Sequence, residues 1–420
     1  MMRRIVESVI GFGMIAGLVV ALTTLTPAAL PRVTTVEATR SVKVVCVPAA
    51  SEATVMVDRA DKAGTLGTET TEATQTVLTA QEAPVVAEGI GGPVGGALTG
   101  SGSVKTLTPC IRPVSQGVIA LPATADTELR IVNPDASEAA IDLTLYGTDG
   151  EIQSLGARGI ALAPFEERTV ALSVLTAEAT PVGVSFKASR GRAAVAAFTQ
   201  TSARATAAIP SQLAQQHYLP GVPAGATQAV VVLANPSEQR LTVDLTAFGT
   251  TPAYVPAGGE DISVAPYSSV AVPLEAALAG EPTAIGVTAD APVIAGLSYT
   301  VTDAAEIAPV QAGTELSTYT APGGVLQLTN PEGEAVSVTV VTTGADAAEE
   351  NATVDVGAGQ TVVHPLPAAE AGQQVRVTAS SPVFGAVVAA GEEGSWVAPL
   401  EPVTSGAVEP IAAELDPSLR

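Results

Sequence analysis

The sequence has few aromatic side chains, and Trp396 is its only tryptophan. Phe, Tyr and Trp together make up 3% of the 420 residues, so the chain is poor in the large rings that anchor tight interfaces. Charged residues make up only 15%, and Ala, Val, Thr and Gly take much of the remaining space. This composition supplies apolar material for several small cores and excludes wholesale disorder. The length suits about three domains.

Positive charge is also scarce. There are 19 Lys and Arg against 42 Asp and Glu, which gives a formal net charge of −23. An acidic surface repels nucleic acid and anionic lipid headgroups, so we expect no nucleic-acid partner. The acidity mainly favours solubility.

Histidine and cysteine occur only twice each. His217 and His364 are isolated, and we expect them to be surface or capping residues. They do not complete a four-ligand zinc set with Cys46 and Cys110, and we expect no metal and no cofactor. In an exported chain the two cysteines favour a disulfide over two free buried thiols. This bridge would close a loop of about 65 residues, for which the chain-entropy model gives about 4 kcal/mol.

Motifs that carry catalysis are missing as well. The sequence has no Ser/His/Asp or Cys/His set, no acidic calcium loop and no phosphate-binding loop. Its carboxylate pairs, such as Glu349-Glu350, are adjacent in sequence, and neighbours on a strand point to opposite faces. We therefore expect a protein without catalytic residues. An enzyme with an unrecognised carboxylate site is the least favoured alternative.

The N-terminus combines two arginines with a long uncharged stretch. Arg3 and Arg4 precede residues 8–30, which are apolar or small, and Pro31-Arg32 follows. About 20 such residues can cross a hydrocarbon core as a helix, and the arginines should stay cytoplasmic. We expect residues 1–31 to be a cytoplasmic tip and uncleaved anchor, with the rest extracytoplasmic. The alternative is a signal peptide cleaved after Ala28 or Ala29, which would make the protein secreted.

One stretch occurs three times in the chain. Each copy is an apolar segment, an Asn-Pro pair and then an alternating segment that ends at Gly. The copies cover residues 129–147, 231–249 and 326–344. Pro fixes φ and lacks an N–H, and Asn bonds local backbone readily, so the pair ends one strand and starts a reversal. We expect a structural turn role for Asn133, Pro134, Asn235, Pro236, Asn330 and Pro331.

The copies recur about 100 residues apart, which fits a whole β-sandwich rather than a solenoid repeat. Further strand–turn–strand blocks follow each copy, which gives about seven short strands per repeat and no βαβ pattern. The predicted fold is all-β: an N-terminal transmembrane helix followed by tandem immunoglobulin-like antiparallel sandwiches. The predicted parts are 1–31 (anchor), 32–112, 113–210 (repeat 1), 211–310 (repeat 2), 311–404 (repeat 3) and 405–420 (acidic tail).

Residues 32–112 show strand character only at their two ends. Between them, residues 61–102 are low in complexity, with a Thr/Glu run followed by a Gly-rich run. Such runs are typical of long loops and irregular edge strands. We therefore expect a disulfide-tied β segment with a Gly/Thr-rich loop, in which the covalent bond replaces packing.

These features resemble a family of uncharacterised actinobacterial envelope proteins that is catalogued as a domain of unknown function. The resemblance rests on the single anchor, the cysteine pair around a Gly-rich segment, and the Asn-Pro strands. It covers residues 33–402, and its most specific parts are 108–110, 129–147 and 159–172. Similar proteins often carry a Trp-Phe pair after the second cysteine, which this chain lacks. The resemblance implies an accessory protein of the cell envelope and hints at glycosyltransferase systems.

We expect a non-catalytic structural or adaptor protein of the envelope, which pairs with an envelope or membrane protein. This expectation follows from the anchor, the tandem repeats and the missing catalytic motifs. The alternative is an array of modules that bind cell-wall polysaccharide through exposed rings. Trp396, which follows Gly394 and Ser395, is the candidate glycan contact for that alternative.

Overall fold

The computed structural model describes most of the chain between residues 41 and 403. The exceptions are residues 51, 69–70, 73–74, 91, 101–104, 124, 178–180, 201–204, 275–277, 279, 345–347, 370–371 and 392–393. All described residues belong to one compact unit, Ser41–Gly406. The expected anchor and acidic tail lie outside them. No helix in the described part of the chain has the length and apolar character needed to span a membrane.

The all-β prediction is confirmed for the described residues. Strands dominate, and the helical elements described are η1 (Leu155–Ala157) and α2 (Leu172–Leu175). The strands form four successive groups, which we name S1 (41–112), S2 (113–212), S3 (213–311) and S4 (312–403). S2, S3 and S4 contain the three Asn-Pro copies.

S1 and S2 contain the first seventeen strands. Those of S1 are β1 (Val42–Cys46), β2 (Ala53–Asp58), β3 (Lys62–Thr65), β4 (Thr71–Glu72), β5 (Gln75–Gln81), β6 (Val85–Gly89), β7 (Val94–Thr99) and β8 (Thr106–Pro109). Those of S2 are β9 (Gln116–Leu121), β10 (Thr127–Val132), β11 (Ala139–Gly147), β12 (Gly150–Ile152), β13 (Ile160–Leu162), β14 (Glu167–Ala171), β15 (Val182–Arg190), β16 (Ala194–Gln200) and β17 (Ala205–Ala208).

S3 and S4 contain the remaining strands. S3 has β18 (Ala214–Val222), β19 (Thr227–Ala234), β20 (Leu241–Phe248), β21 (Ile262–Val264), β22 (Ser269–Pro273), β23 (Thr283–Thr300) and β24 (Ala304–Ile307). S4 has β25 (Gly313–Thr320), β26 (Val325–Thr329), β27 (Val336–Gly344), β28 (Glu349–Val356), β29 (Thr361–Pro365), β30 (Gln373–Gly391), β31 (Gly394–Pro399) and β32 (Glu401–Pro402). The long strands β23 and β30 each pass through both sheets of their unit.

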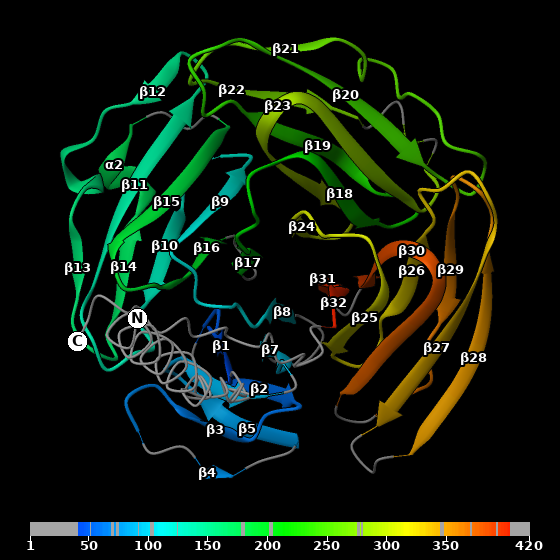
Figure 1. Ribbon diagram of the computed structural model, residues 1–420, viewed down its shortest axis with the longest axis horizontal. Coiled ribbons are helices and arrows are strands. Elements are labelled where there is room, and N and C mark those ends of the chain that lie inside the picture. Colours follow the sequence, from blue (N-terminus) through cyan, green and yellow to red (C-terminus); the bar gives the residue numbers. More distant parts are fainter. Residues whose placement is uncertain are drawn as a thin grey trace, which may run out of the picture. The chain divides into compact units, whose positions relative to one another are not determined.

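All four units share one strand order. The first sheets of the four units are β4-β3-β6-β1, β12-β11-β15-β9, β21-β20-β23-β18 and β28-β27-β30-β25. The second sheets are β5-β2-β7-β8, β14-β10-β16-β17, β22-β19-β23-β24 and β29-β26-β30-β31, and both sheets of a unit run from the rim of the ring to its centre (Figure 1). In an immunoglobulin domain the sixth and seventh strands share a sheet with the third. Here the corresponding strands lie in different sheets, as β6 and β7 do in S1 and β15 and β16 do in S2. The immunoglobulin-like topology that we expected is therefore wrong.

S1 is a fourth copy of the same unit, which differs from the loop-rich segment expected there. The low-complexity residues 61–102 contain five of its strands. Its glycines allow close packing: a Cβ on Gly95 would lie 2.3 Å from the Met56 carbonyl oxygen, and one on Gly89 would lie 2.5 Å from the Arg59 carbonyl oxygen. The glycines of this run therefore let neighbouring backbone approach closely within the sheets.

Each unit has its own apolar core between its two sheets. Alternation along the strands builds it: in β11, Ala139, Ile141, Leu143 and Leu145 are buried while the residues between them are half-buried. The cores of S3 and S4 follow the same pattern in β20 and β27. Period-two alternation of this kind places one face of each strand against the opposite sheet.

The three Asn-Pro asparagines are buried and make the same hydrogen bonds. Each Nδ2 donates to the carbonyl oxygen four residues later, at 2.7 Å to Ser137, 2.6 Å to Gln239 and 2.7 Å to Glu334. Each Oδ1 accepts from the backbone N–H two residues later. A further Nδ2 bond reaches the turn before β14, β22 or β29, at Ala163, Ala265 and Gly357. One amide thus ties two turns together in each unit.

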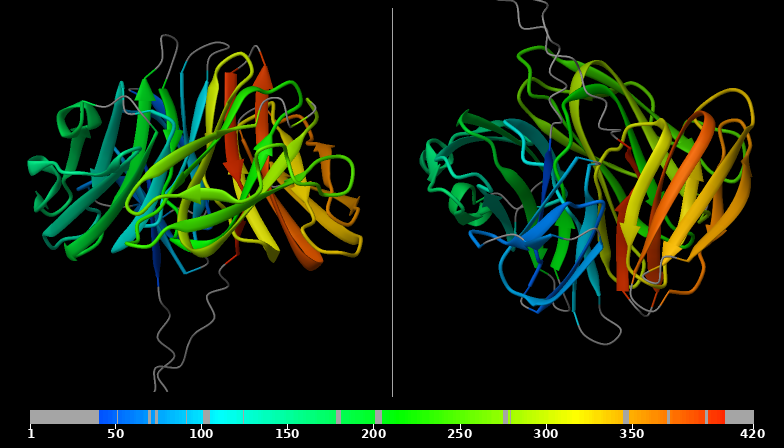
Figure 2. Two further views of the ribbon diagram at one scale, coloured as in Figure 1. Left: turned by 90° about the horizontal axis from the view of Figure 1, so that it is seen from above. Right: turned by 60° about the horizontal axis from the view of Figure 1, so that its bottom comes forward.

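The four units form a closed ring. Apolar clusters join each unit to the next: Val47 of S1 with Phe198 of S2, and Ala120 of S2 with Ile294 of S3. At the S3–S4 interface, Tyr218 stacks on Phe384 with ring centroids 4.3 Å apart. The last unit then packs on the first. Figure 1 shows the units around a common centre, and Figure 2 shows their strands from the side.

Ring closure joins S4 to S1 through a shared core. Met56 and Leu107 of S1 belong to the same apolar cluster as Tyr319 and Trp396 of S4. The centre of the ring is built from the last strand of each second sheet, since β8, β17, β24 and β31 contact one another in turn. Thr106 Oγ1 in β8 donates to the Ala205 carbonyl of β17 at 2.8 Å.

Polar bonds also cross every interface. Lys43 of S1 pairs with Asp135 of S2 at 2.9 Å, and Ser269 Oγ of S3 donates to the Pro181 carbonyl of S2 at 2.6 Å. Thr361 Oγ1 of S4 donates to the Phe248 carbonyl of S3 at 2.6 Å. These contacts, together with the apolar clusters, indicate that the ring behaves as one folded body.

We predict that Gly183→Val destabilises the protein by wedging apart S2 and S3. A Cβ at Gly183 would lie 2.3 Å from the Ala234 Cβ across the interface. Overpacking of this kind costs about 1–3 kcal/mol of unfolding free energy, which urea unfolding would measure. The matched control is Gly333→Val, because nothing lies within 4 Å of that position. Equal stability of the two variants would contradict the interface.

Candidate functional site

Four equivalent chain segments converge at the centre of the ring. After the innermost strand of each unit, the chain turns back and bridges to the first strand of the same unit. Val45 and Ile111 exchange two backbone hydrogen bonds of 2.8 Å in S1, and Val118 pairs with Ser211 in S2. Tyr218 pairs with Val310 in S3, and β32 pairs with β25 in S4. The links between units therefore meet at one place.

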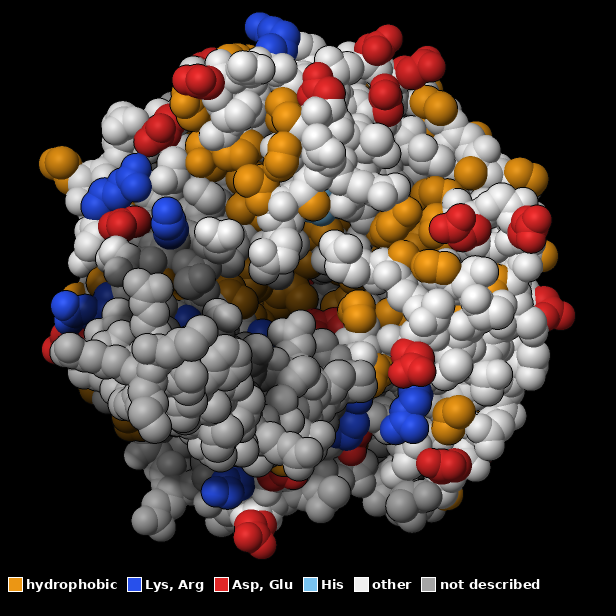
Figure 3. Space-filling model, in the orientation of Figure 1, with side chains coloured by type: hydrophobic (Ala, Val, Ile, Leu, Met, Phe, Trp, Pro, Cys, Tyr) orange, Lys and Arg blue, Asp and Glu red, His pale blue; other side chains and the backbone are white. Residues whose placement is uncertain are grey.

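A cavity of about 350 Å³ lies where these segments meet. Its walls are residues 110–112, 209–212, 309–311 and 399–402, with His217 and Val114 beside them. We call it the axial cavity. Every unit contributes to it, so it exists only when the ring is closed. Figure 3 shows a hollow at the centre of the ring, with apolar side chains gathered around it.

Proline forms much of the cavity wall. Pro210, Pro309, Pro399 and Pro402 line it together with apolar side chains such as Ile209 and Val310. Because proline has no backbone N–H, a wall built from it exposes few donors that need a partner. This composition resembles small-molecule sites, which are mainly apolar with a few convergent polar groups.

The polar groups of the cavity occupy matching positions in the units. The residue after each bridge is Arg112 in S1, Gln212 in S2 and Gln311 in S3, and Pro402 takes this place in S4. The residue before them is apolar in S1 and S3 but is Ser211 in S2 and Glu401 in S4. The repeated backbone thus forms the cavity wall. The side chains at these two positions differ between the units, and they supply the hydrogen-bonding groups of the cavity.

Charged residues concentrate beside the cavity, where S4 meets S1. Ser317 pairs in register with Arg376 on one side and with Glu401 on the other, so the three side chains lie in a row on one sheet face. Arg59 of S1 reaches this row and donates from Nη2 to Ser317 Oγ at 2.9 Å. Burial raises the pKa of Glu401, although Arg112 and Arg59 act to lower it.

Burial also shifts the pKa values of the neighbouring Asp58 and Arg59 side chains. Desolvation raises the pKa of Asp58, and it lowers the pKa of the Arg59 guanidinium. The two side chains lie 4.0 Å apart, from Arg59 Nε to Asp58 Oδ2. Both shifts reflect partial removal of the charged groups from water at the S1–S4 interface.

His217 lines the cavity and is only 1% exposed, so its expected surface or capping position is wrong. Its Nε2 lies 2.8 Å from the Val293 carbonyl oxygen. Because a carbonyl can only accept, Nε2 carries the proton. Burial lowers the pKa of the imidazole, which favours the neutral form at neutral pH.

Glu306 lies on β24, deeper along the ring axis. It borders two small voids of about 20 and 10 Å³, which β8, β17 and β31 also help to line. Burial raises its pKa to about 8. A carboxyl group at this position is therefore largely protonated at neutral pH, and the axis below the cavity is uncharged there.

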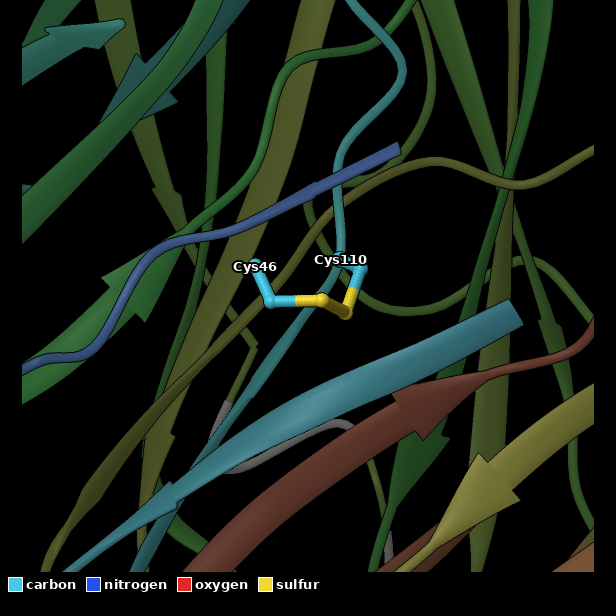
Figure 4. Close-up of a disulfide and its surroundings, with 2 residues drawn as sticks. All are labelled: Cys46 and Cys110. Atoms are coloured by element: carbon cyan, nitrogen blue, oxygen red, sulfur yellow. A yellow bond between two sulfur atoms is a disulfide. The ribbon is translucent and has the colours of Figure 1, made fainter. Parts of the chain in front are cut away.

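The disulfide Cys46–Cys110 is formed, with an S–S distance of 1.97 Å. It connects the end of β1 to the segment that carries Arg112, and Cys110 itself lines the cavity (Figure 4). The bond therefore holds one of the four cavity segments against its own sheet. From the sequence we expected this disulfide only to hold a weakly packed segment in place.

Trp396 does not provide a surface for sugar stacking. It lies on β31, is only 3% exposed and packs in the S4 core, where a Cβ on Gly324 would meet its ring at 2.7 Å. The expected glycan contact at Trp396 is therefore corrected: an enclosed ring cannot stack on a ligand. The turn-like sequence before it belongs to the start of a strand.

The other predicted positions lie apart from the axial cavity. The Asn-Pro turns are absent from its lining, and so are Glu349 and Glu350. Within the described residues, no group of three or more His, Cys, Asp or Glu is placed to hold a metal ion.

Sequence reasoning missed Arg112, Ser211, Gln212, Gln311 and Glu401. The sequence did contain an indication of their shared position. Each lies within three residues after a proline that ends or closely follows an innermost strand, at Pro109, Pro210, Pro309 and Pro399. This pattern is weaker than Asn-Pro because the flanking residues differ in every unit.

Comparison with known proteins gives one match. A family model described as "Family of unknown function (DUF5719)" matches residues 96–367, which run from β7 to β29 and continue just beyond it. No curated protein and no solved structure matches the chain. The match agrees with the resemblance to a family of unknown function.

We predict that Glu306 makes the protein less stable as pH rises from about 5 to 8. The unfolded chain loses this proton near pH 4.5, whereas the folded chain keeps it up to about pH 8. Between these values the folded state binds more protons, so the unfolding free energy falls with rising pH. Glu306→Gln should flatten this dependence in urea unfolding series. The exposed Glu334→Gln variant is the control, and an unchanged slope in Glu306→Gln would contradict the assignment.

Proposed function

The chain belongs to the family of unknown function DUF5719, and we propose that it is a non-catalytic binding protein of the cell envelope. Its ring acts as a rigid adaptor, and the axial cavity receives part of a partner protein. The observation that carries this proposal is the convergence of all four units on one cavity. The cavity wall offers a ligand apolar contact and a few hydrogen-bonding groups.

The closed ring favours binding because it is formed in advance. Four apolar interfaces hold the cavity segments in place, so little ordering is needed when a partner enters. Preformed sites gain affinity by avoiding this ordering cost. Gln212 and Gln311 are exposed at the mouth, where carboxamides can donate to and accept from peptide groups.

Extracytoplasmic location is part of the proposal. The disulfide supports it, because disulfides persist in oxidising compartments. The uncharged stretch 8–30 behind Arg3 and Arg4 also supports it, either as an anchor in the cell membrane or as a cleaved signal. The proposed partner is therefore an envelope or membrane protein that meets the ring outside the cytoplasm.

Photo-crosslinking in cells tests the proposal. A photoreactive residue at Gln311 lies at the cavity mouth, and one at Thr339 lies on the exposed face of β27 as a matched control. We expect Gln311 to give one reproducible protein adduct that Thr339 does not give. Identification by mass spectrometry would name the partner. The same adducts from both positions, or no adduct from Gln311, would contradict binding at the cavity.

A further inference from the structure

Positively charged residues outnumber negatively charged ones beside the axial cavity, where S4 meets S1. Arg59, Arg112 and Arg376 stand there with Asp58 and Glu401. Guanidinium groups stay charged in proteins, whereas burial favours the neutral form of carboxyl groups. This local surplus occurs in a chain whose net charge is −23.

Among these three arginines, Arg112 is the one that lines the cavity. Its equivalents in S2 and S3 are the uncharged Gln212 and Gln311, and the S4 position is Pro402. The cavity lining therefore combines one guanidinium group with Pro210, Pro309 and their apolar neighbours. A ligand with one anionic end and one apolar part matches both kinds of group.

The size of the cavity limits how much of a partner can enter. About 350 Å³ is at the lower end of the range for small-molecule sites, which runs from about 300 to 1,000 Å³. This space suits the end of a chain better than an extended segment. Glu401 also lines the cavity, where burial raises the pKa of its carboxyl group while Arg112 and Arg59 act to lower it.

We propose that the axial cavity binds a carboxylate that is joined to an apolar side chain, as in the C-terminal residue of a partner protein. The carboxylate lies against Arg112, and the apolar side chain lies against the proline wall. This inference rests on the proposed binding function and names the chemistry of its ligand. Planar guanidinium and carboxylate groups form paired hydrogen bonds, which gives the site its preference.

The test compares an acid with its neutral isostere on the purified full-length chain. N-acetyl-leucine and N-acetyl-leucinamide differ only in the carboxylate, and calorimetry or ligand-observed NMR would measure their affinities. We expect the acid to bind at least tenfold more tightly than the amide. A heptapeptide ending in leucine should show the same preference over its C-terminally amidated form.

The matched variant is Arg112→Gln, which installs the residue that S2 and S3 carry at this position. It should bring the ratio of the two affinities to about one. Arg158→Gln, at an exposed arginine of S2, is the control and should keep the preference. Equal affinity for acid and amide, a preference retained in Arg112→Gln, or no saturable binding of either probe would overturn the inference.

The peptide arm distinguishes the ligand source. Binding of the heptapeptide and N-acetyl-leucine alike supports a protein C-terminus, whereas binding of N-acetyl-leucine alone would replace the partner with a small free acid and overturn the inference as stated. An adduct at Gln311 with no acid preference would leave the binding function standing and remove only this ligand chemistry.

Discussion

The closed ring depends on the contact between S1 and S4, the first and last units of the chain. Met56 and Leu107 of S1 share one apolar cluster with Tyr319 and Trp396 of S4, and Arg59 bonds across to Ser317. These residues lie more than 200 positions apart in the sequence, so their contact closes the whole chain on itself. Without it the four units would form an open row, and the axial cavity would lose one wall. Packing at this one interface thus links the fold to the site.

The asparagine turns show what the sequence predicts well. Each buried amide bonds to backbone within a few residues and to one nearby turn, so its geometry depends on local sequence. That is why S2, S3 and S4 were found from a repeated Asn-Pro pair. S1 was missed as a sandwich because Arg59, with a positive φ of 57°, stands at the asparagine position. Its Gly-rich strands also resemble loops in composition, although close packing requires the glycines.

The axial cavity could not be predicted, because its residues come from four places about 100 residues apart. No local pattern says that the segments after β8, β17, β24 and β31 meet, since this depends on the interfaces between units. The same limit explains Trp396, whose neighbours in the sequence resemble a turn while its contacts are in a core. Local sequence patterns therefore predict the turns and strands of each unit, whereas contacts between units determine which residues line the cavity.

Small-angle X-ray scattering of residues 41–406 tests ring closure most directly. A compact body of this length has a radius of gyration of about 21 Å, and the closed ring predicts a value near this with a single-peaked distance distribution. An open row of four sandwiches would give a clearly larger radius and a long tail of distances. That result would contradict the S1–S4 interface, the axial cavity and the function that we assign to it.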